Sequence, residues 1–179
     1  MMIRTRSAVL PDVDSIHAII QPYAEDGTLL PRDIHELSEN VRDFVIAERE
    51  YPLHKNRIAG CGALHLYGIH LAEIRSIAVS PEHKGLGIGR LLVEALVQES
   101  RRHAIGCVCL FTRTPGFFRH MGFQVALRQE LPDKIYKDCI HCPKLHDCDE
   151  IAMVMGAVPA NSNGLRDPRI QIPFVKLGA

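Results

Sequence analysis

Hydrophobic and polar residues alternate, or recur at helical spacing, along most of the chain, which divides it into short strands and helices. Residues 3–7 alternate apolar and polar side chains, as expected of a strand. Pro11 suits the start of a helix, and Val13, Ile16 and Ile20 fall on one face of the segment that follows. The same signals predict a short helix over Ile34, Leu37 and Val41, strands over 44–48, 58–66, 71–79, 108–111 and 151–155, a long helix over 90–103, and a short helix closed by Gly122 before a sixth strand. The predicted order is therefore βααβββαβαββ.

Two connecting segments carry the signals of irregular structure. Residues 21–31 contain Pro22 and Gly27 as breakers, and residues 51–57 are predicted to form a polar turn between two strands. In the long helix, the predicted buried stripe consists of Leu91, Leu92, Ala95 and Leu96.

Composition and charge narrow the class of protein. The chain has 179 residues, 46% of them hydrophobic, with 21 basic and 21 acidic residues. We expect one domain over residues 1–156 and a C-terminal tail over 157–179. The balanced charge disfavours nucleic acid or an anionic membrane as a partner. No apolar run is long enough to span a bilayer, and the N-terminus lacks the apolar core of a signal peptide. We therefore expect a cytoplasmic protein with reduced cysteines.

A loop with glycines at positions 85, 87 and 89 connects the strand at 71–79 to the long helix. Glycines at alternate positions allow successive backbone N–H groups to turn toward one point without obstruction by side chains. The N-terminus of the following helix adds its partial positive charge at the same place. This arrangement suits a pyrophosphate.

The spacing of this loop excludes two common nucleotide motifs. The glycines read G-x-G-x-G, whereas a dinucleotide-binding loop needs G-x-G-x-x-G and a P-loop needs Gly-Lys-Ser/Thr at its end. An ordinary glycine-rich turn remains the alternative. The segment Lys84–Gly89 resembles the Gln/Arg-x-x-Gly-x-Gly/Ala signature of the Gcn5-related N-acetyltransferase (GNAT) family, with Lys84 in place of Arg or Gln. Residues 117–124 resemble the closing F-Y-x-x-x-G-F segment of that family, and the resemblance extends over residues 3–155.

The resemblance implies an α/β (α+β) fold, in which helices flank a mixed central sheet, and acetyl-CoA as co-substrate. It implies that backbone N–H groups of the fourth strand hold the thioester and the pantetheine arm. It also implies that the glycine loop binds the pyrophosphate. The cofactor-binding residues expected on this basis are Ile77, Ala78, Val79, Lys84, Gly85, Leu86, Gly87, Ile88, Gly89, Arg90 and Phe118.

The chemistry of acetyl transfer requires a deprotonated amine and a place for the leaving thiolate. Glu73 lies where many family members have the general base; the alternative is a surface pair with Arg75, two residues further along the strand. Phe118 stands where the family usually has a tyrosine as general acid. Thr112, Thr114 and Tyr136 are candidate substitutes, and direct proton transfer from the attacking ammonium to the thiolate is another route.

Four segments resemble short amino-acid N-acetyltransferases, the stand-alone counterpart of the acetyltransferase domain of N-acetylglutamate synthase. These are residues 4–6, 27–33, 73–81 and 131–139. The resemblance implies acetylation of the α-amino group of glutamate, the first step of arginine biosynthesis, and glutamine remains an alternative. We expect the protein to lack the amino-acid kinase domain that longer synthases carry. A dicarboxylate acceptor needs cationic donors, and the candidates are Arg32, Arg75 and Lys137, with Ser76 beside them, although each cation alone also suits a solvated surface.

Three cysteines and two histidines gather within residues 139–148. Cys139 and Cys142 have the C-x-x-C spacing of a zinc knuckle, and Cys148 with His141 or His146 would complete a tetrahedral structural site. A loop of reduced thiols is the alternative. We expect Cys61, Cys107 and Cys109, which lie in apolar strands, to be core residues.

Two other functions compete with amino-acid acetylation. One is an acetyltransferase for another amine or for a protein N-terminus. The other is a non-catalytic module that binds acetyl-CoA or senses a metal, which the phenylalanine at position 118 and the Cys/His segment suggest. A homodimer is a common arrangement in the family, and the sequence does not determine the oligomeric state.

Overall fold

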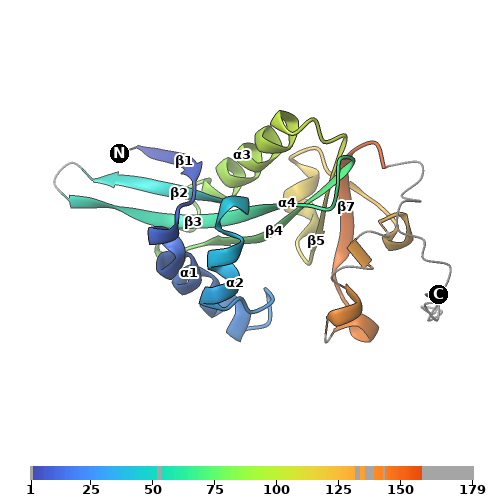
Figure 1. Ribbon diagram of the computed structural model, residues 1–179, viewed down its shortest axis with the longest axis horizontal. Helices are drawn as coiled ribbons and strands as arrows, with labels where there is room; N and C mark the ends of the chain where they lie inside the picture. The colour runs from blue at the N-terminus through green and yellow to red at the C-terminus, as the bar shows by residue number, and fades with distance from the viewer. Residues whose placement is uncertain (1, 52–53, 132–133, 136–138, 143, 159–179) are drawn as a thin grey trace.

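A seven-stranded mixed sheet runs through the protein (Figure 1). The computed structural model describes residues 2–51, 54–131, 134–135, 139–142 and 144–158. The strands are β1 (Ile3–Ser7), β2 (Phe44–Tyr51), β3 (His54–Leu66), β4 (Leu71–Val79), β5 (Cys107–Thr112), β6 (Gln124–Val125) and β7 (Ile151–Gly156). They lie in the order β1-β2-β3-β4-β5-β7-β6, and every neighbouring pair is antiparallel except β4 and β5, which are parallel.

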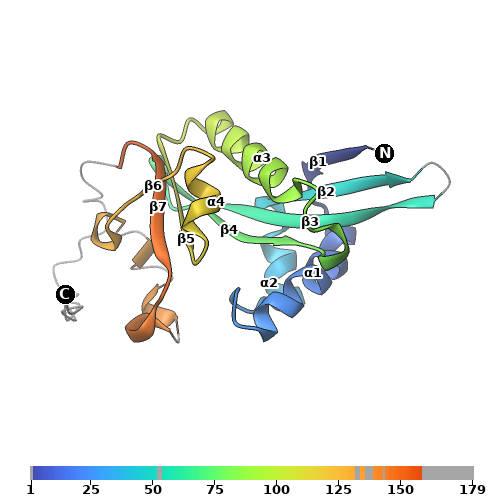
Figure 2. The same cartoon turned by 180° about the vertical axis from the view of Figure 1, so that it is seen from behind.

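Helices cover both faces of this sheet (Figures 1 and 2). They are α1 (Val13–Glu25), α2 (Ile34–Glu39), α3 (Ile88–Arg102) and α4 (Pro115–Arg119). The apolar face of α3 packs on one side of the sheet, where Leu92 and Leu96 meet Leu64 and Ile74 in the largest core cluster. On the other side, α1 and α2 bury a second cluster, to which Ile16, Ile20 and Leu37 belong. The protein is therefore a three-layer α/β structure, as the sequence predicted.

The predicted order of elements is confirmed, and the predicted bounds of β4 are those observed. Helix α1, however, continues through Pro22 to Glu25, where an irregular segment was expected. Pro22 lacks one helical N–H, but the next turn is anchored to the sheet by Tyr23, whose hydroxyl donates to the Val79 carbonyl at 2.7 Å. Tertiary contact thus outweighs the local signal.

Two other local predictions were wrong. Residues 54–57, expected in a turn, belong to β3, because pairing with β2 continues to the Tyr51–His54 pair. In α3, Leu91 is 37% exposed, whereas Val93 and Val97 are buried with Leu92 and Leu96. The face of α3 that packs on the sheet therefore consists of Leu92, Val93, Leu96 and Val97, and differs from the predicted stripe.

Three cysteines lie in the core, as predicted. Cys61, Cys107 and Cys109 are fully buried. Burial raises the pKa of the Cys61 thiol to about 12, and burial also raises the pKa of Cys107 and of Cys109. These thiols stay protonated and serve as small apolar side chains. Within the described parts of the chain, none of the helices has the length and apolar character needed to cross a bilayer. The predicted tail is described only as far as residue 158.

Candidate active site

Strands β4 and β5 pair over only part of their length. Leu71, Ala72 and Glu73 are opposite residues 107–109, yet β4 continues to Val79 and β5 to Thr112. Beyond Glu73 the two parallel strands are no longer paired, and the place between their carboxyl-terminal halves is called the opening below. Ligands of open α/β sheets bind at such strand ends. The opening is the natural place for an extended ligand that needs backbone hydrogen bonds.

A β-bulge in β4 lies beyond the last residue that pairs with β5. Cys61 is opposite Ala78 and Ala63 is opposite Arg75, so that Ser76 and Ile77 together face one residue of β3. Ser76 has φ +53°, a left-handed conformation that costs free energy in a residue other than glycine. Strain of this kind is characteristic of functional sites.

The backbone of β4 presents alternate groups to the opening. The Ser80 N–H donates to Ala59 of β3, and the Val79 carbonyl points the other way, toward Tyr23. Because successive residues of a strand alternate, the N–H groups of Ile77 and Val79 face the opening and that of Ala78 faces β3. The sequence assigned all three residues to the cofactor; the strand geometry favours Ile77 and Val79.

The glycine loop has the conformation that an anion cradle requires. Gly85 and Gly87 have φ +79° and +75°, and no atom lies within 4 Å of a Cβ placed on either residue. Gly87 is the N-cap of α3, whose first intrahelical hydrogen bond joins the Leu91 N–H to the Gly87 carbonyl. The N–H groups of residues 88–90 are thus the open donors of the helix N-terminus, and they fit a pyrophosphate.

We predict that Gly87→Val raises the KM for acetyl-CoA about tenfold, equivalent to about 1.4 kcal/mol of binding, because valine disfavours the left-handed conformation and fills the cradle. The value of kcat should change little. Steady-state kinetics at saturating acceptor measure both constants. The control is Gly68→Ala, a glycine with open space around it and a φ outside the left-handed range. Equal KM values for Gly87→Val and wild type would contradict an anion site here.

Of the two adjacent phenylalanines of α4, the one that the sequence assigned to the cofactor lies in the core and the other lies beside the helix N-terminus. Phe118, expected to face the cofactor, is 8% exposed and packs edge-on against Phe123 in the core. Phe117 is 42% exposed, and its ring lies 3.5 Å from a Cβ placed on Gly89. Phe117 is therefore the aromatic side chain beside the helix N-terminus. Phe117 is the first residue of the F-Y-x-x-x-G-F motif, to which the sequence analysis gave no role of its own.

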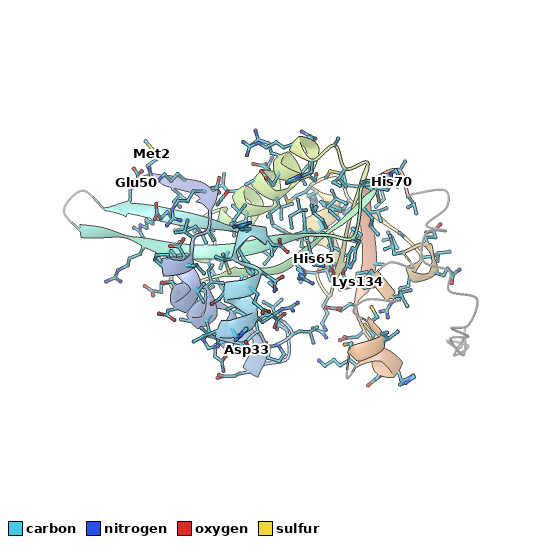
Figure 3. All side chains as sticks on the ribbon, in the orientation of Figure 1. Met2, Asp33, Glu50, His65, His70 and Lys134 are labelled. Atoms are coloured by element: carbon cyan, nitrogen blue, oxygen red, sulfur yellow. The ribbon has the colours of Figure 1, made fainter. Side chains whose placement is uncertain are left out.

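Glu73 is a buried carboxylate with two donors. It is 3% exposed, receives the Tyr67 hydroxyl at 2.7 Å, and forms an ion pair with the Lys134 ammonium at 2.8 Å. Glu73 is therefore not on an exposed strand surface, where the alternative placed it. Figure 3 shows Lys134 close to the strands, on the side of the sheet that carries α2. The sequence analysis named neither Tyr67 nor Lys134. Lys134 is 61 residues from Glu73 along the chain, so no local spacing connects the two.

Thr112 lies apart from Glu73. Along β5, Cys109 and Phe111 pack with the cluster near Glu73, whereas Leu110 packs beneath α3. By this alternation the Thr112 side chain lies on the α3 side. Its hydroxyl accepts the Thr114 N–H at 3.0 Å and lies 3.1 Å from the Thr114 hydroxyl, so it stabilises the turn into α4. The third candidate acid, Tyr136, is outside the described residues.

Three of the four predicted acceptor residues line one small pocket. Arg32, Arg75 and Ser76 surround it together with Glu36, Leu37, Asn40 and Phe44, and its volume is about 10 Å³, room for about one water molecule. The Arg32 guanidinium forms an ion pair with the Glu36 carboxylate. Arg75 and Glu73 are two residues apart on β4 and face the same side of the sheet. The structure thus brings the Glu73 carboxylate and the Arg32 and Arg75 guanidinium groups to one face of β4. The fourth predicted residue, Lys137, is outside the described residues.

The end of α1 and the segment 26–28 that follows it form hydrogen bonds with residues of both strands that border the opening, or next to them. Tyr23 at the end of α1 binds Val79 of β4, and Arg113, just after β5, donates to the carbonyl oxygens of Gly27 and Thr28 at 3.0 and 3.1 Å. Arg113 also binds Asp149 at 2.7 Å. This ion pair lowers the pKa of Asp149, mainly through the hydrogen bond from Arg113. The segment therefore spans the opening on the α1 side of the sheet.

The described part of the Cys/His segment gives no support to the predicted zinc site. Cys139 begins a 3₁₀ turn and its carbonyl accepts the Cys142 N–H. The Cys148 sulfur lies 3.1 Å from the Arg128 guanidinium, which also binds the Cys148 carbonyl. No group of three side chains able to hold a metal ion is found among the described residues, which do not include the side chain of His141.

Comparison with known proteins agrees with this geometry. Residues 40–125 match the acetyltransferase (GNAT) domain. The chain is 40% identical over 149 residues to an uncharacterized N-acetyltransferase of Chlorobaculum tepidum, covering 83% of this chain and 93% of that relative. It is 36% identical over 118 residues to the amino-acid acetyltransferase of Mycobacterium tuberculosis, covering 66% of each chain.

Among solved structures, N-acetylglutamate synthase from Neisseria gonorrhoeae, complexed with coenzyme A and N-acetyl-glutamate, has a TM-score of 0.76 at 28% identity. The similarity covers 87% of this chain and 35% of the synthase, so the synthase is much the longer protein. With 40% identity to a relative covered almost in full, and with the fold and glycine loop described above, the chain belongs to the GNAT family of acetyltransferases.

Proposed function

We propose that this protein transfers the acetyl group of acetyl-CoA to the α-amino group of glutamate or glutamine. The observation that carries the proposal is that Arg32, Arg75 and Ser76 lie together at the bulge of β4, around a pocket of about 10 Å³; the acceptor would bind over these groups at the edge of the pocket rather than inside it. An amino acid with a polar side chain needs a donor set for its α-carboxylate and another for its side-chain oxygen. Two guanidinium groups and a hydroxyl supply these donors.

Glu73 is the group that would receive the proton of the attacking amine. It lies on the same strand and the same face as Arg75, so an amino acid anchored by the arginines would have its amine near this carboxylate. Bound acetyl-CoA would supply the activated acetyl group. The N–H groups of Ile77 and Val79 would hold its pantetheine arm and thioester in the opening, and the glycine loop would bind its pyrophosphate.

The names of related proteins support the same acceptor class. A relative that is 36% identical to this chain is named amino-acid acetyltransferase. The N-acetylglutamate synthase of similar fold was solved in complex with coenzyme A and N-acetyl-glutamate. We therefore extend the proposal to the first step of arginine biosynthesis. Phe118 leaves the closing helix without a hydroxyl at the motif position, and we propose that the thiolate takes its proton from the ammonium formed in the attack.

The test is acetyl transfer to a panel of free amino acids, followed by mass spectrometry of both the acetylated product and free CoA. We expect rapid turnover with glutamate or glutamine and little with lysine or polyamines. Arg32→Gln and Arg75→Gln should raise the KM for the amino acid about tenfold or more and leave acetyl-CoA binding unchanged. Arg102→Gln, which removes an exposed arginine on α3, is the matched control.

The panel also separates the competing functions. Turnover with a peptide N-terminus or a simple amine, but with no amino acid, would show an acetyltransferase of another acceptor class. Binding of acetyl-CoA without turnover on any amine would show a non-catalytic module. Either result would reject amino-acid acetylation.

A further inference from the structure

We propose that His65, oriented by Asp43, is the proton exit of the active site: the residue that takes the proton received by Glu73 and releases it to the solvent. This inference rests on the proposed function in one respect, that Glu73 receives a proton from the acceptor. It does not depend on which amine is acetylated, because any acceptor that arrives as an ammonium loses a proton before it attacks.

His65, labelled in Figure 3, lies on β3 directly opposite Glu73 of β4. Directly opposed residues of antiparallel strands have their side chains on the same face, with Cβ atoms about 4.5–5.5 Å apart. Tyr67, two residues further along β3, shares this face. Its hydroxyl donates to Glu73 at 2.7 Å, and its ring meets the His65 ring edge-on, with centroids 5.1 Å apart. His65 is therefore an immediate neighbour of the Tyr67–Glu73 pair.

Asp43 determines which nitrogen of the His65 ring can accept a proton. It ends the 3₁₀ turn Val41–Asp43 before β2, and its carboxylate lies 3.0 Å from His65 Nδ1. An ionised carboxylate can only accept a hydrogen bond, so Nδ1 carries the proton of the neutral ring and Nε2 is left as the acceptor. A carboxylate that holds the far nitrogen also stabilises the imidazolium once it forms. The pair is thus arranged to take a proton through Nε2.

Glu73 needs such a neighbour because it has little contact with water. It is 3% exposed, and the side chain of its partner Lys134 is 12% exposed. An ammonium has no electron pair to accept a proton, so Lys134 cannot carry the proton away, and the Tyr67 hydroxyl is already a donor to Glu73. The side chains of His65 and Asp43, in contrast, are 27% and 28% exposed. They connect the buried carboxylate with the solvent.

The proposed steps balance. The ammonium of the acceptor gives a proton to the Glu73 carboxylate, which leaves a neutral amine and a carboxylic acid. The O–H bond of that acid then breaks as an N–H bond forms at Nε2 of His65, and the imidazolium passes the proton to water or buffer. The negative charges of Glu73 and Asp43 favour the imidazolium, whereas Lys134 and Arg75 bring positive charge to the same face and oppose it. Each group returns to its initial state, and one proton is released per acetyl group transferred.

The experiment measures kcat of wild type and His65→Ala in dilute buffer, with and without added imidazole. We expect His65→Ala to lower kcat about tenfold, less than the loss expected for the base itself. Imidazole should restore most of this loss, because it can take the proton in place of the missing ring. His65→Gln, which is closer in size, repeats the measurement and guards against a folding defect. The matched control is His35→Ala, since His35 is exposed and also pairs with a carboxylate, that of Glu39.

A wild-type kcat in both His65 variants would overturn the inference. A lowered kcat that imidazole leaves unchanged would also overturn it, because it would mean a structural role. The proposed function is judged separately by the amine that the wild type acetylates. If that amine is not an amino acid, the proposed acceptor is wrong, and the proton exit is tested with the amine that does react. If the wild type acetylates no amine, both proposals are rejected.

Discussion

Glu73→Gln is expected to lower kcat for amino-acid acetylation by about 100-fold, because glutamine cannot accept the proton of the attacking amine. The KM for acetyl-CoA should stay near its wild-type value, since the glycine loop is independent of this side chain. Stopped assays with the mass-spectrometric readout measure kcat, and titration with CoA measures binding.

The control for this prediction has to separate chemistry from folding. Glu73→Gln also removes the counter-charge of Lys134, a side chain that is 12% exposed. The double variant Glu73→Gln/Lys134→Met removes both members of the pair and still lacks the base. An equally low kcat in both variants would assign the loss to the missing carboxylate. Recovery of activity in the double variant would mean that Glu73 is not the base.

Lys134→Met is expected to lower the free energy of unfolding by about 3 kcal/mol, because it leaves the buried Glu73 carboxylate without its ammonium partner. The Tyr67 hydroxyl remains as a donor, which keeps the loss at the low end of the range for broken buried pairs. Urea denaturation followed by circular dichroism measures the change.

A double-mutant cycle with Glu73→Gln checks the cause of this loss. The double variant should be more stable than Lys134→Met, since it contains no uncompensated buried charge. Arg90→Met is the comparison for a surface pair: Arg90 is largely exposed and binds Glu94 one turn away. Arg90→Met should leave the free energy of unfolding nearly unchanged, because exposed ion pairs contribute little. An equally small change for Lys134→Met would contradict the burial argument.

Local signals were enough to predict the order of elements and the glycine loop. Periodicity gave the bounds of β4, and the spacing of Gly85, Gly87 and Gly89 predicted a strand-loop-helix anion site. Its first two glycines, Gly85 and Gly87, have the left-handed conformation that such a site needs. These features depend on neighbours a few residues apart. The sequence contains that information directly.

The chemical environment of the site could not be predicted in the same way. Glu73 was named as a base, but its burial and its contact with Lys134 arise from the packing of residues far apart in the chain. Arg32 was named as an acceptor residue, whereas its pairing with Glu36 depends on rotamers in the first turn of α2. The motif phenylalanine was placed at the cofactor, because a sequence motif does not tell which of two adjacent rings turns into the core.

The side chains that hold the segment 26–28 in place form hydrogen bonds with its main-chain carbonyl groups. Arg113 binds the carbonyl oxygens of Gly27 and Thr28, and Lys144 lies 3.3 Å from the Gly27 carbonyl. The identity of the Thr28 side chain therefore does not enter into the attachment. Substitutions at this position can therefore change the side chain that the segment presents while its attachment is preserved, so this short segment can vary in sequence without a new scaffold.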